Sequence, residues 1–231
     1  ERVAGRVLAK YPRDSFCLAD KFPGHQISET HYPQEIFEEQ LKKCKTDFFD
    51  FYLVHNVCEM NINEYLDPAY GTYDYLVAQK KNGRIRHLGF SAHGDMTVLR
   101  RFLAVYGDAM EFCQLQINWF DWTFQQAQQK YDYITSLGIP VWVMEPVRGG
   151  KLANLGEDEA KLKALRPDES IPAWAFRWLQ RLPDVKMILS GMSNLEQMKD
   201  NVKTFEAFAP LSESENERLA GLEETLKREI V

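Results

Sequence analysis

Ionisable side chains follow two short apolar runs in this sequence, at the point where each run ends. The run SFCLAD is followed by Lys21, and the run DFFDFYLV is followed by His55. A histidine can donate a hydrogen bond to a substrate oxygen, and a lysine cation lowers the pKa of a neighbouring acid. Such a pair suits a reaction in which negative charge develops on an oxygen atom. Taken alone, a lysine in this position is usually a solvated surface residue, and a histidine is as often structural as catalytic.

Other polar or polarisable side chains follow the remaining apolar runs in the same way. They are Ser91 with His93, Gln114 with Gln116 and Asn118, Met144 with Glu145, and Ser190 with Gly191. Such residues would all meet at one rim if the apolar runs were parallel strands of one barrel. The order of the secondary structure elements therefore decides whether these side chains can form a site.

Six apolar runs are typical of buried strands, because β-branched and aromatic residues dominate each of them. These runs cover residues 15–20, 48–56, 86–92, 112–118, 140–147 and 185–191. Amphipathic stretches between them predict helices. The first opens with Pro33, where the missing N–H costs little, and the second ends near Gly83. Further helices are expected at 95–106, 123–137, 170–181, 194–205 and 212–229.

Strands that alternate with helices in this way predict an α/β fold with a parallel sheet and right-handed crossovers. An open sheet that binds a dinucleotide should show G-x-G-x-x-G after an early strand, and this sequence has no such stretch. We therefore expect a (β/α)8 TIM barrel. In a barrel the chemistry gathers at the C-terminal ends of the strands, where His55 would lie.

Composition excludes several classes of partner. The 231 residues are 45% hydrophobic with a formal net charge of -6, and lysine and arginine are dispersed, so we expect no nucleic-acid partner. No apolar run approaches the roughly 18 to 20 residues of a membrane span, so we expect no membrane partner. The cysteines Cys17, Cys44, Cys58 and Cys113 lack the spacing of metal ligands, which predicts no metal site. Their sparse use favours the cytoplasm. The oligomeric state is left open.

Five segments of the sequence resemble, in order and spacing, the aldo-keto reductases. They are DFFDFYLVHN, GRIRHLGFSAH, FCQLQINWFD, GIPVWVMEPVRGGKL and MILSGMSNLEQMKDNV. The resemblance covers essentially the whole chain and is to a bacterial branch that often carries a C-terminal ferredoxin-like tail. It implies an oxidoreductase that reduces an aldehyde or ketone to an alcohol. Hydride comes from NAD(P)H, and a tyrosine assisted by lysine, histidine and aspartate donates the proton.

Lys21 and His55 match the lysine and histidine of that family. The family tyrosine and aspartate would precede Glu1, and none of the ten tyrosines occupies the required position. We therefore expect residues 1–231 to form a single barrel domain that is N-terminally incomplete, with about six of eight strands and the first two missing. The alternatives are a non-catalytic nicotinamide-cofactor-binding module or an inactive fragment. An iron–sulfur cluster is conceivable only in a segment outside this chain, since no C-x-x-C is present.

The resemblance also assigns cofactor-binding residues. Ser91 and Gln114 match the residues at the nicotinamide carboxamide, although Ala92 and Cys113 replace two frequent asparagines. Met144 stands where many relatives stack a tyrosine on the nicotinamide, and its alternative role is to fill the core. The segment EPVRGGKL resembles the pyrophosphate loop, with Glu145, Pro146, Gly149, Gly150 and Lys151, and either Arg148 or Lys151 adds positive charge.

The segment SGMSNLEQMKDN resembles the part that binds the adenosine 2'-phosphate and the adenine, with Gly191, Ser193, Gln197, Asp200 and Asn201. The family often has lysine and arginine where this chain has Gly191 and Gln197, which weakens the preference for a 2'-phosphate. NADP(H) is nevertheless favoured over NAD(H). Two features stay open at this point. His93 either lines the substrate side or caps the next helix, and Trp119, Phe120 and Trp122 either form a substrate wall or pack under a loop.

Overall fold

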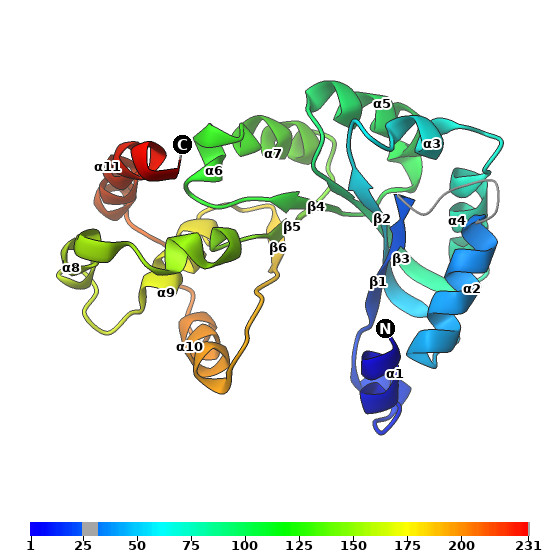
Figure 1. The fold of residues 1–231 in the computed structure, drawn as a ribbon, viewed down its shortest axis with the longest axis horizontal. Helices are drawn as coiled ribbons and strands as arrows, with labels where there is room; N and C mark the ends of the chain where they lie inside the picture. Colours follow the sequence, from blue (N-terminus) through cyan, green and yellow to red (C-terminus); the bar gives the residue numbers. More distant parts are fainter. Residues whose placement is uncertain (25–31, 231) are drawn as a thin grey trace. The chain divides into compact units, whose positions relative to one another are not determined.

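The computed structural model describes residues 1–24 and 32–230. The chain divides into two compact units, Glu1–Gln114 and Leu115–Val231. Six strands follow one another in a sheet in the order β1-β2-β3-β4-β5-β6, and helices connect successive strands (Figure 1). The pairings of β1 with β2, β2 with β3 and β5 with β6 are parallel. The predicted α/β class with a parallel sheet is confirmed, and the single, N-terminally incomplete domain stays a prediction.

The first unit is built on three parallel strands, β1 (Ala19–Pro23), β2 (Phe49–Val57) and β3 (Ile85–Ala92). Its helices are α1 (Arg2–Leu8), α2 (Pro33–Cys44), α3 (Ile62–Leu66), α4 (Thr72–Lys81) and α5 (Met96–Tyr106). Short 3-10 turns lie at Arg13–Ser15 and Gly107–Ala109.

Aromatic rings of α2 and β2 form the centre of this unit. Phe37 of α2 meets Phe49 and Tyr52 of β2 edge-on, with ring centroids 5.7 and 5.1 Å apart, and all three side chains are fully buried. Rings in this arrangement contribute more than their buried area alone. Helix α2 begins with Pro33 in its first turn, as predicted, and ends where Lys45 adopts a left-handed conformation. Helix and strand are therefore held in one orientation.

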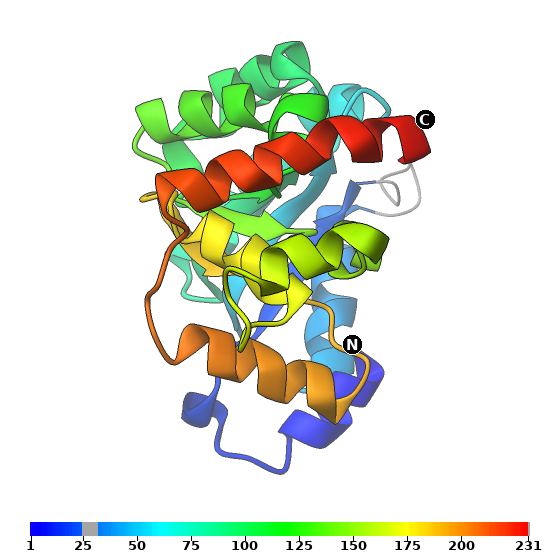
Figure 2. The same cartoon turned by 90° about the vertical axis from the view of Figure 1, so that its left-hand side faces the viewer.

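The second unit contains the end of β4 (Cys113–Gln116), which crosses the boundary, and the strands β5 (Val141–Met144) and β6 (Val185–Ile188). Its helices are α6 (Asp121–Phe124), α7 (Ala127–Ser136), α8 (Glu159–Lys163), α9 (Ile171–Leu179), α10 (Leu195–Phe205) and α11 (Glu213–Ile230). Two 3-10 segments, Arg148–Ala153 and Gly156–Asp158, follow β5. Figure 2 shows α11 as one continuous helix.

The strands expected at 112–118, 140–147 and 185–191 end two or three residues early, and two other predicted elements differ more from the observed ones. The strand expected at 15–20 begins only at Ala19, because Arg13 closes a 3-10 turn and donates a hydrogen bond to Asp50 at 2.6 Å. Cys17, which falls inside the strand expected at 15–20, is therefore exposed and outside β1, whereas Cys44, Cys58 and Cys113 are buried. The helix expected at 123–137 is divided into α6 and α7, because Gln126 is left-handed.

Among the described residues, no group of three histidine, cysteine, aspartate or glutamate side chains is arranged to hold a metal ion. No helix in the described part of the chain is long and apolar enough to cross a membrane.

An ion pair fixes the start of α11 in the second unit. Arg166 Nε and Nη2 donate to the two carboxylate oxygens of Glu215 at 2.6 and 2.9 Å. The Ser212 N–H donates to the same carboxylate at 2.8 Å. The hydrogen bonds from Arg166 lower the pKa of Glu215 from 4.5 to about 2. The pair therefore stabilises the folded protein only while Glu215 is ionised.

The pH dependence of stability follows from this pair. A carboxyl group with a lowered pKa in the folded state contributes stability above its unfolded pKa and loses that contribution as the pH falls. The free energy of unfolding should therefore decline between about pH 4.5 and pH 2, and Glu215→Gln should reduce that decline. Urea unfolding at several pH values measures it. The control is Glu213→Gln, which breaks a largely exposed ion pair with Arg181 and should change the pH dependence of the free energy of unfolding little. An equal effect of the two variants would contradict the prediction.

Candidate active site

Strand pairing brings three of the predicted residues to one face of the first unit. The register places Lys21 opposite Leu53 and Pro23 opposite His55. Since side chains alternate along a strand, Lys21 and His55 lie on the same face. Leu53 is also opposite Gly89, so Ser91, two residues further along β3, shares that face. The predicted gathering of residues near the C-terminal strand ends is present within this unit.

A bulge sets the direction of the end of β2. The register of β2 against β3 shifts between Val54 and Val57, and Asn56 has a φ of 56°. Ser91 Oγ accepts a hydrogen bond from the Asn56 N–H at 2.8 Å. Asn61 Nδ2 donates to the Asn56 carbonyl oxygen at 2.7 Å. Asparagine tolerates the left-handed conformation better than most residues, so the local sequence and the two contacts together fix the chain just after His55.

The backbone of His55 has its own anchor. The Tyr65 hydroxyl donates to the His55 carbonyl oxygen at 2.5 Å, and its ring lies 6.2 Å from that of Phe22 in β1. Neither Tyr65 nor Asn61 is among the residues that the sequence pattern predicts for the site. The only sequence signal was their closeness to His55 in a chain segment that also holds the short helix α3.

Lys21 lies in a partly desolvated position. Burial lowers its pKa from 10.5, and the neighbouring carboxylate of Asp20 opposes that shift. Burial also raises the pKa of Asp20. Gln40 Nε2 donates to the Lys21 carbonyl oxygen at 2.8 Å, which holds the strand against α2. The Lys21 ammonium therefore loses its proton more easily than a solvated lysine does.

Gln114 presents an unsatisfied hydrogen-bond acceptor. Its side chain is buried, with 2% exposure, and its carboxamide oxygen has no donor among the described residues. Buried polar atoms are normally paired, so an orphaned one calls for an explanation. Ser91 is also fully buried. Its oxygen accepts the bond from Asn56, and the hydroxyl proton remains available for donation.

A cavity in the second unit collects most of the other predicted residues. It has a volume of about 500 Å³ and lies between the end of β5, the segment after it, the end of β6 and α10. The predicted residues in its lining are Met144, Glu145, Pro146, Gly149, Gly150, Gly191, Ser193, Gln197 and Asn201. A volume of this size suits a small organic ligand.

Hydrogen bonds order the β6 side of this cavity. Gln197 Oε1 accepts from the Ser193 N–H at 2.7 Å, and Asn201 Nδ2 donates to Ser190 Oγ at 3.1 Å. Two predicted residues lie outside the lining. Asp200 accepts a hydrogen bond from Ser170 Oγ, and Lys151 is exposed.

The guanidinium of Arg148 pairs with a carboxylate, and Arg148 does not line this cavity. Its Nε donates to Asp121 Oδ1 at 3.1 Å, and its guanidinium lies 5.0 Å from the ring centroid of Phe120. Of the two cations that the sequence offered for a phosphate, Lys151 is therefore the one without a carboxylate partner among the described residues. Asp121 was missed, because nothing in the sequence shows that a residue 27 positions away pairs with it.

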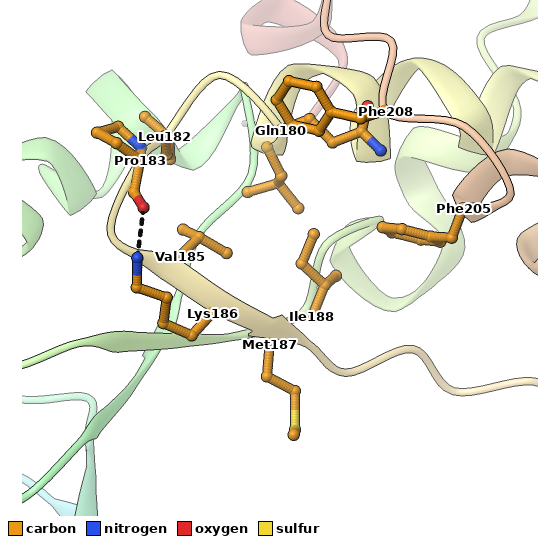
Figure 3. Close-up of a pocket in the computed structure, with 10 residues that line it drawn as sticks. Gln180, Leu182, Pro183, Val185, Lys186, Met187, Ile188, Phe205 and Phe208 are labelled. Carbon is orange, nitrogen blue, oxygen red and sulfur yellow. Dashed lines mark hydrogen bonds between the residues drawn. The ribbon is translucent and has the colours of Figure 1, made fainter.

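A second cavity of about 520 Å³ lies at the end of α9, β6 and the segment after α10 (Figure 3). Its lining is mainly apolar and includes Val185, Ile188, Phe205 and Phe208. The Lys186 ammonium in this lining donates to the Pro183 carbonyl oxygen at 2.8 Å, drawn as the dashed line. None of the predicted site residues lines this cavity, so it is not the candidate site.

The structure also bears on two features that the sequence leaves open. The N-cap of α5 is Asp95, whose carboxylate accepts from the N–H groups of Thr97 and Val98, so His93 does not cap that helix. Phe120 is fully buried, and the ring of Trp122 lies 5.3 Å from that of Trp178 in α9. Both aromatic residues thus contact other parts of the second unit, and a substrate wall formed by Trp119, Phe120 and Trp122 stays a prediction.

Comparisons with known proteins agree with the sequence pattern. The model of the Aldo/keto reductase family matches residues 1–224. The chain belongs to the aldo/keto reductase family. This confirms the predicted family, and members of that family are oxidoreductases of carbonyl compounds.

The aldo/keto reductase described here is similar to an NADH-specific methylglyoxal reductase of Escherichia coli, with 24% identity over 100% of this chain and 78% of that protein. Its structure resembles an aldo-keto reductase from Bacillus halodurans in the holo form, with a TM-score of 0.73, 23% identity and coverage of 96% and 77%. It also resembles an aldo-keto reductase from Klebsiella pneumoniae in complex with NADP and acetate, with a TM-score of 0.71, 21% identity and coverage of 97% and 74%. The chain therefore shares the predicted (β/α)8 barrel fold of these enzymes.

The left-handed conformation at position 56 can be tested directly. Asn56→Gly should keep the protein within about 0.5 kcal/mol of its original stability, because glycine adopts positive φ freely. Asn56→Val should lower the free energy of unfolding by about 1–2 kcal/mol or more, because a β-branched residue resists that conformation. Urea unfolding of the two variants measures the difference. Equal stability of the glycine and valine variants would show that position 56 is not left-handed.

Proposed function

We propose that this chain reduces a small aldehyde or ketone to an alcohol with NAD(P)H as the hydride source. The cavity of the second unit carries the proposal, because it gathers predicted dinucleotide-binding residues from two separate segments of the sequence. The relatives support a nicotinamide cofactor, since one is named NADH-specific and another was crystallised with NADP.

On the family resemblance, the nicotinamide carboxamide of the cofactor would bind Ser91 and Gln114. A carboxamide group carries one strong acceptor and two N–H donors. Gln114 Oε1 lacks a donor among the described residues, and a carboxamide N–H would satisfy it. The Ser91 hydroxyl would donate its proton to the carboxamide oxygen.

The remaining predicted residues suit the rest of the dinucleotide. Gly149 and Gly150 have φ values of 62° and 91°, which glycine adopts freely. Because glycine has no side chain, phosphate oxygens could approach the backbone N–H groups here. Lys151 would add positive charge beside them. Met144, in the lining, would contact the nicotinamide ring through its thioether, and Gly191, Ser193, Gln197, Asp200 and Asn201 would surround the adenosine. NADP(H) remains the predicted partner on the resemblance, although neither lysine nor arginine lines this cavity.

His55 and Lys21 would act on the carbonyl oxygen of the substrate. When bound, the reduced cofactor supplies the hydride. His55 would donate a hydrogen bond that orients the carbonyl, and the Lys21 cation would stabilise the negative charge that develops on its oxygen. Because burial lowers the pKa of Lys21, this stabilisation would be lost at a lower pH than it would be for a solvated lysine. The proton that completes the alcohol would come from the tyrosine that the family resemblance implies. The sparse use of cysteine in the sequence supports the proposed cytoplasmic location.

Substitution of the two proposed catalytic residues tests this function. His55→Ala and Lys21→Met should each lower kcat by about 100-fold or more, because each removes an interaction with the developing charge. The dissociation constant for NAD(P)H should stay within about threefold, because neither side chain is assigned to the cofactor. Carbonyl-dependent oxidation of NADPH or NADH, followed by absorbance, gives the rates.

The control is His87→Ala, a histidine of β3 whose side chain is 52% exposed, and it should leave kcat unchanged. Wild-type turnover by either of the two test variants would refute the assignment. Dinucleotide binding by the unmodified chain with no turnover of any carbonyl compound would instead favour the cofactor-binding module.

Gln114→Leu tests the proposed carboxamide contact. The change removes the acceptor while keeping the volume, so the dissociation constants for NADPH and NADH should rise about tenfold, the worth of one hydrogen bond of this kind. Gln79→Leu changes another buried glutamine of the first unit and should leave both constants unchanged. Fluorescence titration measures both dinucleotides and so also tests the preference for NADP(H). If Gln114→Leu bound NADPH and NADH as tightly as the unmodified chain does, Gln114 would not belong to the cofactor site.

A further inference from the structure

A buried carboxylate lies behind the cavity of the second unit. Asp121 is fully buried, and its Oδ1 accepts the hydrogen bond from Arg148 Nε at 3.1 Å. Its Oδ2 accepts from Gln116 Nε2 and from Asn118 Nδ2, both at 2.8 Å. The Asp121 N–H donates to Asn118 Oδ1 at 2.8 Å. The carboxylate thus has three donors that belong to the end of β4, to the segment after it and to the segment after β5.

The segment after β5, residues 145–150, is called the wall loop here, because five of its residues line the cavity. Two residues of the wall loop that are not glycine have left-handed conformations, Glu145 with a φ of 56° and Arg148 with a φ of 50°. Such conformations persist only where neighbouring groups hold them. Asn118 Nδ2 donates to the Glu145 carbonyl oxygen at 3.0 Å, and Asp121 binds the side chain of Arg148. The partners of one carboxylate therefore hold both strained positions.

The ion pair of Asp121 and Arg148 is shielded from water. The Arg148 side chain is 15% exposed and that of Asp121 is 0% exposed. The guanidinium lies 5.0 and 5.6 Å from the ring centroids of Phe120 and Phe124. Removing one partner of a shielded pair leaves the other charge without compensation. Loss of Asp121 would therefore release Arg148 and, with it, the wall loop.

We propose that Asp121 is a positioning residue for dinucleotide binding, acting through Arg148 and Asn118 to hold the wall loop in the shape of the cavity wall. This inference rests on the proposed function of the cavity. Asp121 does not line the cavity itself, so its effect reaches a ligand only through the loop. The same pairing explains why Arg148 is not the cation that meets a phosphate.

The test uses the full chain with Asp121→Asn, Arg148→Met and the double variant. Each single variant should raise the dissociation constant for NADPH or NADH about tenfold and speed hydrogen exchange of the amides of residues 144–152. The kcat at saturating dinucleotide should stay within about twofold, because the loop is not assigned to the reacting atoms. The double variant should bind no more weakly than the weaker single variant, since the two residues act as one pair.

Glu215→Gln serves as the matched control, because it breaks another shielded ion pair of the second unit. It should change neither the dissociation constant nor the exchange of the wall loop. If Asp121→Asn does not fold, Arg148→Lys replaces it; this variant keeps the charge but lacks the Nε–H, and it should raise the dissociation constant about threefold.

Unchanged affinity and unchanged exchange of the wall loop in the Asp121 and Arg148 variants would overturn the proposal. Faster exchange across the whole unit, matched by the control, would also overturn it, because Asp121 would then be only structural. A wild-type chain that binds neither dinucleotide would refute the proposed function together with this inference. The wild-type titration therefore separates that outcome from a failure of the inference alone.

Discussion

Parallel pairing of β1, β2 and β3 is the constraint on which the first unit depends. In parallel strands the register decides both which side chains share a face and which strand ends lie together. Lys21, His55 and Ser91 come from segments far apart in the sequence, and the register alone places them on one face. The rings of Phe37 and Tyr52 bury the opposite side of this arrangement. A slip of one residue would turn His55 into that core, where an imidazole would lack compensation.

Much of the fold was predictable because apolar runs and helix signals are local. The strand at 86–92 and the helix at 95–106 agree with β3 and α5 to within one residue. The errors arise where a distant contact overrides the local pattern. Arg13 reaches Asp50, 37 positions away, and so delays the start of β1. No window of the sequence contains both residues, so no local pattern could have shown this.

The residues of the candidate site likewise fall into those that a local sequence pattern reveals and those that it does not. Its positions near strand ends, such as His55 and Gln114, could be found from the end of an apolar run together with the family resemblance. The residues that hold those positions could not, since Tyr65 and Asn61 act through hydrogen bonds to backbone atoms, which no sequence pattern reveals. Arg148 illustrates the limit most clearly. Its type and place beside two glycines suited a phosphate, and only the three-dimensional arrangement reveals its buried partner.

The bulge in β2 separates the regularly paired part of the strand, up to Val54, from the chain that follows it. Up to Val54 the strand keeps regular register with β3, and beyond the left-handed Asn56 the pairing resumes with an offset at Val57. The left-handed backbone of Asn56 thus accommodates the offset in register between the two paired stretches. Changes of sequence after Val57 that spare Asn61 and Tyr65, which bond to the backbone of Asn56 and His55, can therefore accumulate without being transmitted back to His55. A barrel of this kind can acquire new substrate preferences on its rim while its reacting groups stay in place.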